Sequence, residues 1–88
     1  MPNPSFKLAI LTPKKKVFSG EISSLVAPGE LGYLGILANH APLVTTLAPG
    51  KVTFRDPAGG TQVLQSTGEG LLEVHHNSVT LLLDEVAG

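Results

Sequence analysis

The residue best suited to proton-transfer chemistry is His40, because an imidazole changes its charge near neutral pH. It lies in the segment Leu-Ala-Asn-His-Ala-Pro (37–42), which contains no nucleophile and no carboxylate. The nearest acidic residues in the sequence are Glu30 and Asp56, and turns are expected between each of them and His40. A general base acts only on a group within hydrogen-bond reach. We therefore interpret His40 as a structural or contact residue, and keep catalysis by His40 with Glu30 or Asp56 as a less favoured alternative.

His75 and His76 are adjacent, so on a regular strand their side chains would point to opposite faces. Zinc sites need three or four ligands, and the chain has no cysteine to complete such a set. The sequence therefore predicts no metal site here. The pair is better interpreted as part of the polar tip of a hairpin.

Three glycines, Gly29, Gly32 and Gly35, recur at every third position. This spacing differs from the G-x-G-x-x-G pattern of dinucleotide-binding loops, and no strand-to-helix pattern follows it. The glycines instead predict a tight β-turn or a close backbone contact. We expect no cofactor at this loop.

The charge of the chain argues against nucleic acid as a partner, and its low content of charged residues suggests exposed apolar side chains. Six basic residues against seven acidic ones give a net charge of −1, so the chain has no basic patch for nucleic acid. The one charge run, Lys14–Lys16, follows a proline and predicts an exposed hairpin turn. Charged residues make up only 15% of this small chain, against about 25% in an average soluble protein. Some apolar side chains are therefore expected to face outward and bind a partner.

The elements that position these residues are predicted to be strands. Phe6, Leu8 and Ile10 alternate with Lys7 and Ala9, which is typical of a half-buried strand. The same alternation predicts strands at 51–55, 72–74 and 79–83. Further strands are predicted at Val17–Phe18, Glu21–Ala27, Ile36–Leu37, Leu43–Leu47 and Gln62–Ser66. Ten glycines and seven prolines separate these segments with turns. The pattern predicts a single all-β domain over residues 1–88, folded as a sandwich or barrel without helices.

One long segment carries a family resemblance. Residues 32–50 read G-Y-L-G-I-L-A-N-H-A-P-L-V-T-T-L-A-P-G. This resembles the signature of the ε subunits of F-type ATP synthases, which is close to G-E-L-G-I-L-P-G-H-A-P-L-L-T-x-L-x-P-G. The segments V-F-S-G-E (17–21), G-L-L-E-V (70–74) and N-S-V-T (77–80) resemble the same family. The resemblance covers nearly the whole chain.

The resemblance implies a flattened ten-stranded β-sandwich in a non-catalytic rotor subunit of the central stalk. Such a subunit docks on the γ subunit and on the membrane c-ring, and helps couple ion translocation to ATP synthesis. It is present once per complex, needs no cofactor, and touches the membrane only through the c-ring. The implied location is peripheral, on the cytoplasmic face of the bacterial inner membrane or its organelle equivalent.

The resemblance also implies two sets of contact residues. The expected γ-subunit contacts are Thr12, His40 and Thr45, and the expected c-ring contacts are Leu31, Gly32 and Tyr33. The family's Pro-Gly before the histidine is Ala38-Asn39 here, and asparagine tolerates positive φ, so the turn should be kept. Tyr33 stands where the family often has an acidic residue, so an aromatic contact is expected there.

Family members usually carry a C-terminal helical hairpin after the sandwich, and nothing in this sequence resembles it. We therefore expect neither hairpin-mediated inhibition of ATP hydrolysis nor ATP binding from these 88 residues. An alternative of another class stays open, in which the chain is a free-standing β-sandwich that binds a small apolar ligand between its sheets. A melting temperature that depends on such a ligand would favour this alternative.

Overall fold

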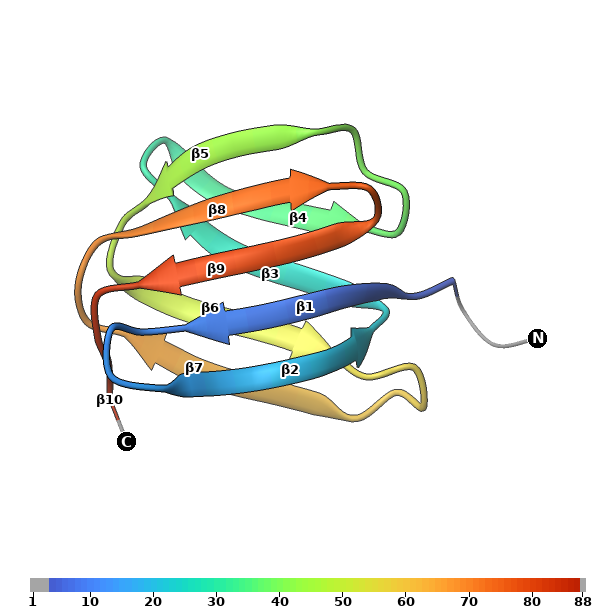
Figure 1. Cartoon of the computed structure of the whole chain (residues 1–88), viewed down its shortest axis with the longest axis horizontal. Helices are drawn as coiled ribbons and strands as arrows, with labels where there is room; N and C mark the ends of the chain where they lie inside the picture. The colour runs from blue at the N-terminus through green and yellow to red at the C-terminus, as the bar shows by residue number, and fades with distance from the viewer. Residues whose placement is uncertain (1–3, 88) are drawn as a thin grey trace.

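The computed structural model describes residues 4–87, and these fold into ten strands without a helix, as the sequence predicts (Figure 1). The strands are β1 (Phe6–Leu11), β2 (Lys16–Ile22), β3 (Ser24–Gly29), β4 (Gly32–Leu37), β5 (Leu43–Leu47), β6 (Gly50–Arg55), β7 (Thr61–Ser66), β8 (Gly70–His75), β9 (Ser78–Leu83) and β10 (Val86–Ala87). Most are six residues long, and each alternates inward and outward side chains.

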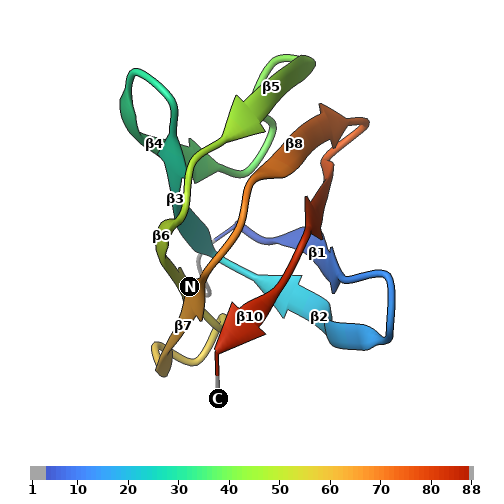
Figure 2. The ribbon, with the colours of Figure 1, turned by 90° about the vertical axis from the view of Figure 1, so that its left-hand side faces the viewer.

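The strands form one curled sheet that makes two layers (Figure 2). One layer runs β5-β8-β9-β1-β2, and the other runs β4-β3-β6-β7-β10. The layers join where Gly29 of β3 pairs with Leu47 of β5. Among the described residues β1 and β9 are the parallel pair, and the other paired strands are antiparallel. The expected flattened sandwich is confirmed.

The core lies between the two layers and is almost entirely apolar. Phe18 of β2 packs on Phe54 of β6 with ring centroids 4.6 Å apart, which links the layers across their open side. The buried polar side chain is Ser66, whose hydroxyl donates to the Gly68 carbonyl at 3.1 Å. The buried apolar residues occupy inward positions of eight strands, β1 to β6, β8 and β9. They are Phe6, Leu8, Ile10, Ile22, Leu25, Ala27, Ile36, Leu47, Val52, Phe54, Leu72, Val74, Val79, Leu81 and Leu83.

The prediction of one continuous strand at Glu21–Ala27 is wrong. β2 ends at Ile22 and β3 begins at Ser24, because the chain passes from one layer to the other at Ser23. The Ser23 amide donates to the Arg55 carbonyl at 2.8 Å, and its hydroxyl contacts the carbonyls of Arg55 and Asp56. These bonds attach the crossing point to the end of β6.

The turns agree with the sequence. Glu30 and Leu31 form a two-residue turn between β3 and β4, where a side chain on Gly29 would meet the Gly32 carbonyl at 2.7 Å. His76 and Asn77 form the tip between β8 and β9 with φ of 49° and 57°, typical of a type I′ turn. The predicted polar hairpin tip is confirmed, with His75 as the last residue of β8.

Candidate docking surfaces

The outward side of the β5-β8-β9-β1-β2 layer carries a row of leucines. The register places Leu71 of β8 opposite Leu82 of β9, and Leu82 opposite Leu11 of β1. Leu82 is 46% exposed, and Val44 on β5 is 63% exposed on the same side. We call this outward side the leucine face, with the row Leu71, Leu82 and Leu11 at its centre. Exposed apolar side chains that adjoin one another are typical of protein-docking surfaces.

Two predicted γ contacts lie near the ends of this row. Thr46, the neighbour of Thr45, pairs with Leu71, and Thr12 directly follows Leu11. Thr12 also lines a hollow of about 460 Å³ with Leu11 and Leu82. The Thr45 side chain itself points inward, because Thr45 pairs with the buried Leu72.

The turn that contains Thr12 is locked by its own hydrogen bonds. The Thr12 amide donates to the Lys15 carbonyl at 2.9 Å, and the Lys15 amide lies 3.3 Å from the Thr12 hydroxyl oxygen. The predicted turn at the lysine run is confirmed for Lys14 and Lys15, whereas Lys16 begins β2. The Thr12 corner of the leucine face is therefore a fixed feature.

His40 lies in the loop between β4 and β5, at the other end of the sheet from Thr12 (Figure 1). Its Nδ1 is 2.7 Å from the Ala41 carbonyl oxygen. A carbonyl only accepts, so in the neutral ring Nδ1 carries the proton and Nε2 does not. This contact holds the His40 ring against its own loop. Asn39 has a φ of 62°, so the expected tolerance of a left-handed turn is confirmed.

Asn77 anchors the His40 loop from the neighbouring hairpin. Its Oδ1 accepts from the Asn39 amide at 2.6 Å, and its Nδ2 donates to the Ser5 carbonyl at 3.0 Å. One side chain thus joins the β4–β5 loop, the β8–β9 turn and the segment before β1. The sequence contains no local signal for this role, since the three segments are distant along the chain.

The predicted c-ring contacts form the tip and shoulder of the β3–β4 hairpin. Leu31 is fully exposed at the tip, and Gly32 follows it with a φ of 135°. Tyr33 is 60% exposed, and its hydroxyl oxygen accepts from the Lys51 amide at 3.1 Å. Gly50 makes this approach feasible, because a Cβ there would meet the Tyr33 oxygen at 2.9 Å. The tip thus presents the exposed Leu31 beside Glu30, and its base is held by the Tyr33 hydrogen bond.

The structure brings some of the predicted contacts together and separates others. A shallow hollow of about 290 Å³ is lined by Leu31, Gly32, Tyr33 and Thr45 with their neighbours. The c-ring set and Thr45 therefore share one region. His40 lies at the opposite end of β4 and β5.

The alternative of catalysis through His40 gains no support from the placement of its expected partners. Glu30 lies in the β3–β4 turn, at the far end of β4 from the His40 loop. The Asp56 carboxylate caps its own turn by accepting from the amides of Ala58 and Gly60 at 2.9 and 3.0 Å. Neither carboxylate is among the hydrogen-bond partners of His40 in the described part of the chain.

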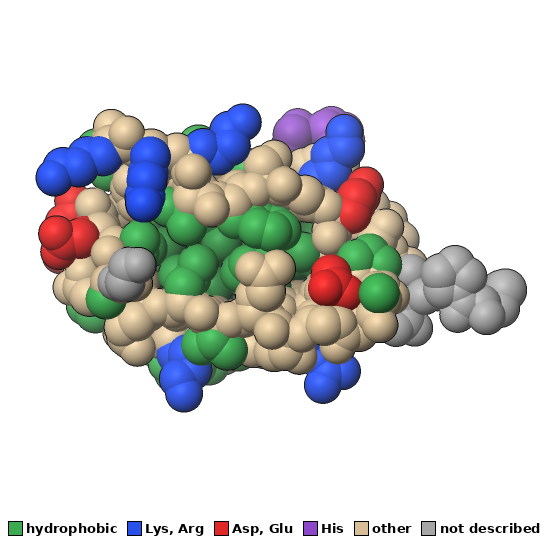
Figure 3. All heavy atoms as spheres, turned by 90° about the horizontal axis from the view of Figure 1, so that it is seen from below, with side chains coloured by type: hydrophobic (Ala, Val, Ile, Leu, Met, Phe, Trp, Pro, Cys, Tyr) green, Lys and Arg blue, Asp and Glu red, His purple; other side chains and the backbone are tan. Residues whose placement is uncertain are grey.

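The opening between the two layers forms an apolar trough, seen in Figure 3 as a green hollow framed by polar side chains. It lies between β2 and β7 and has a volume of about 950 Å³ at its β10 end. Its half-buried apolar lining comes from Val17, Leu64 and Val86. In residues 4–87, every buried side-chain polar atom has a hydrogen-bond partner.

Comparison with known proteins assigns the fold to a family. The family model described as "ATP synthase, Delta/Epsilon chain, beta-sandwich domain" matches residues 5–87. The chain belongs to this family. It is 44% identical over 82 residues to the ATP synthase epsilon chain of Dichelobacter nodosus, covering 93% of this chain and 57% of that one. It is 49% identical over 76 residues to the epsilon chain of Pelotomaculum thermopropionicum, covering 86% and 55%.

Solved structures show the same fold. A chain of the Euglena gracilis mitochondrial ATP synthase (OSCP/F1/c-ring) superposes with a TM-score of 0.88 at 19% identity, covering 99% of this chain and 56% of that one. A chain of the Tetrahymena thermophila mitochondrial ATP synthase (central stalk/c-ring) gives a TM-score of 0.80 at 17% identity, covering 99% and 69%. The chain spans little more than half of the length of each curated relative named above.

Sequence reasoning missed the leucine face, although a signal for it exists. Each leucine of the row stands directly beside a buried apolar residue, at Ile10-Leu11, Leu71-Leu72 and Leu81-Leu82-Leu83. In a strand, adjacent side chains point to opposite faces, so an apolar pair must expose one member.

No helix in the described residues is long and apolar enough to cross a membrane.

Proposed function

We propose that this chain is a non-catalytic rotor subunit of the central stalk of an F-type ATP synthase, which docks on the γ subunit and on the c-ring. The observation that carries the proposal is the leucine row beside Thr12 and Thr46, in a chain of the delta/epsilon family. As a rotor subunit it would help couple ion translocation to ATP synthesis. It would be an accessory subunit rather than an enzyme.

The leucine face is the surface that we assign to γ. Leu82 and Val44 are largely exposed, and Leu71 and Leu11 are half-buried beside Leu82, so a partner could cover them together. Burial of apolar area stabilises association by about 25 cal/mol per Å², less the entropy lost on docking. Thr12 lies at one corner of this surface, and the exposed His40 lies in the loop before β5, at the other end of the layer.

The β3–β4 hairpin is the feature that we assign to the c-ring. Leu31 projects from a two-residue turn, which leaves the side chain free to insert between groups of a partner. The Tyr33 hydroxyl bond to the Lys51 amide fixes the base of the hairpin against β6. A hairpin with a fixed base transmits a sideways force better than a mobile loop does, which suits a rotor contact.

The assembly that follows from these contacts is a single copy of the chain per complex. The chain would be held at the membrane only through the c-ring, on the cytoplasmic face of a bacterial inner membrane or the equivalent face in an organelle. Contact with nucleic acid is not expected at a net charge of −1.

Native mass spectrometry of the chain mixed with its cognate γ subunit tests the proposal. The expected result is a one-to-one complex, both with isolated γ and with the catalytic head. The variant Leu31→Asp should still bind γ but should lose retention on the c-ring. Failure of the folded wild-type chain to bind folded γ would overturn the proposal.

The apolar trough favours one second candidate, a module that binds a small apolar ligand between the layers. Val17, Leu64 and Val86 would supply the apolar walls of such a site. The dye 1-anilinonaphthalene-8-sulfonate tests this candidate, because its fluorescence rises in apolar sites. A raised melting temperature with the dye, lost in Leu64→Asp, would support the ligand-binding module, and unchanged melting would exclude it for this class of ligand.

A further inference from the structure

The outward side of the other layer, made by β4, β3, β6 and β7, exposes a second apolar surface. Four of the seven exposed large apolar side chains lie on it, and Leu31, Val44 and Leu82 lie elsewhere. The four are Val26, Tyr33, Leu37 and Val63. We call this surface the basic face, for the charges described below.

Strand register shows that these residues form one continuous surface. Val26 of β3 lies opposite Gly35 of β4 on one side and Thr53 of β6 on the other, and Thr53 lies opposite Val63 of β7. Leu37 pairs with Ser24 in the next outward row. Three strand intervals of about 4.8 Å and two row intervals of about 6.8 Å make the surface about 14 Å by 14 Å. Gly35 has open space above it, so the middle of the surface is low.

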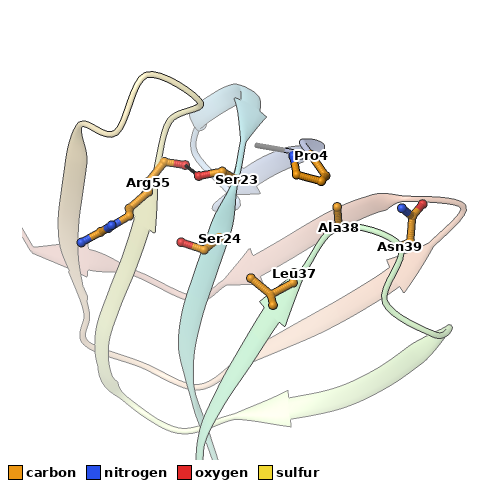
Figure 4. Close-up of a pocket in the computed structure, with 7 residues that line it drawn as sticks. All are labelled: Pro4, Ser23, Ser24, Leu37, Ala38, Asn39 and Arg55. Carbon is orange, nitrogen blue, oxygen red and sulfur yellow. Dashed lines mark hydrogen bonds between the residues drawn. The ribbon is translucent and has the colours of Figure 1, made fainter. Parts of the chain in front are cut away.

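The charge of this surface has a single sign. Lys51 and Arg55 are the charged residues among the outward positions of these four strands, and both are exposed. Arg55 follows Ser24 and Leu37 across the strands, and the three residues line a hollow of about 490 Å³. Figure 4 shows the Arg55 side chain extending away from Leu37. No outward position of these strands carries a carboxylate.

These charges select among occupants. Two copies packed through this face would bring the basic side chains of both copies together, which disfavours a symmetric dimer. Lys51 and Arg55 lie on either side of Thr53 on β6, with Val26 and Val63 on the neighbouring strands. Two cations in so apolar a setting are too few for a phosphate backbone. A helix is about 10–12 Å wide and commonly covers an apolar sheet face, and carboxylates on its flanks would meet Lys51 and Arg55.

We propose that the basic face docks an amphipathic helix of a partner protein, with apolar residues over Val26, Leu37 and Val63 and acidic residues facing Lys51 and Arg55. This face lies on the opposite outer side from the leucine face, so both can be occupied at once (Figure 2). The proposal stands independently of the docking on γ, and the basic face shares Tyr33 with the surface assigned to the c-ring.

Nuclear magnetic resonance titration of the 15N-labelled chain tests the proposal. The probe is a synthetic helical peptide of about 18 residues with leucines three and four positions apart and glutamates flanking that stripe. A control peptide has lysine in place of each glutamate. We expect amide shifts confined to β3, β4, β6 and β7, and about tenfold weaker binding of the control peptide.

Variants of the chain separate charge from shape. The double variant Lys51→Glu with Arg55→Glu should reverse the preference between the two peptides, whereas Lys7→Glu on the leucine face should leave both affinities within about twofold. Shifts that map to the leucine face or to the trough, or equal affinity for the two peptides, would overturn the proposal. So would self-association of the chain through β4 and β7 in the absence of peptide.

Discussion

The leucine face and the basic face are built from the same fold but differ in charge. The leucine face has charged residues of both signs around its apolar row, and Lys7 of β1 lies opposite Glu21 of β2 in the strand register. The basic face carries Lys51 and Arg55 without a carboxylate among its outward positions. The difference teaches that apolar exposure provides area for docking, whereas the surrounding charges determine which partner fits.

The faces also differ in what holds their edges. The leucine face ends at the His40 loop and the β8–β9 turn, which are joined through the Asn77 side chain. The basic face ends at the β3–β4 hairpin, which is held by the Tyr33 hydroxyl and by the close approach at Gly50. Each edge therefore depends on a different residue, and substitutions can loosen one face at a time.

The largest loss of stability is expected from Asn77→Ala. It removes the bonds to the Asn39 amide and the Ser5 carbonyl and places a residue with a Cβ but no polar side chain at a φ of 57°. We expect a loss of about 3 kcal/mol in the free energy of unfolding, measured by urea titration. Asn77→Gly removes the same bonds without the backbone strain, so it should lose about 1 kcal/mol less.

Hydrogen exchange of these variants sharpens the comparison between the faces. Amides of the His40 loop should exchange faster in Asn77→Ala, while those of β6 and β7 should change only by the global loss. Equal acceleration throughout the chain would contradict a local anchoring role.

A smaller loss is expected from Gly50→Ala at the edge of the basic face. The new methyl would meet Pro28 Cβ at 2.8 Å and the Tyr33 oxygen at 2.9 Å, so the ring must move off the Lys51 amide. We expect a loss of about 2 kcal/mol in the free energy of unfolding. Gly35→Ala is the matched control, because its Cβ meets nothing within 4 Å, and a gain of up to about 0.5 kcal/mol is expected there. Losses of equal size in both variants would refute the steric explanation.

The smallest effect concerns ATP hydrolysis. The 88-residue chain, added to a catalytic head that lacks its ε subunit, should bind γ while the hydrolysis rate stays unchanged, because nothing in this sequence resembles the inhibitory hairpin. A steady-state ATPase assay, with bound chain measured in the same sample, checks this. Strong inhibition at saturating chain would show that the sandwich itself restrains the head.

Much of this fold could be predicted from the sequence because strand alternation and turn residues act locally. The strand containing Phe6, Leu8 and Ile10, the glycine turn before Gly32 and the left-handed Asn39 all follow from such local rules. The break at Ser23 could not be predicted, because it depends on the carbonyl of Arg55, which lies far along the chain. Val86–Ala87 was missed as a strand because two residues show no alternation.

The docking surfaces were only partly predictable for the same reason. The family resemblance predicted Thr12, Thr45 and Tyr33 as contacts, and their roles remain predictions. The leucine row and the basic face each combine residues from three or more strands, so the register of the sheet had to be known first. Low charge content indicated outward apolar side chains, but it did not say that they would divide between two faces.

Calorimetric titration of γ with two matched variants tests the central claim most directly. Leu82→Arg places a charge in the leucine row, and Val63→Arg makes the same kind of change on the basic face. We predict that Leu82→Arg weakens γ binding by about 100-fold or more, while Val63→Arg stays within about twofold of the wild-type chain. Equal weakening by both variants, or weakening by Val63→Arg alone, would contradict the assignment of the leucine face to γ.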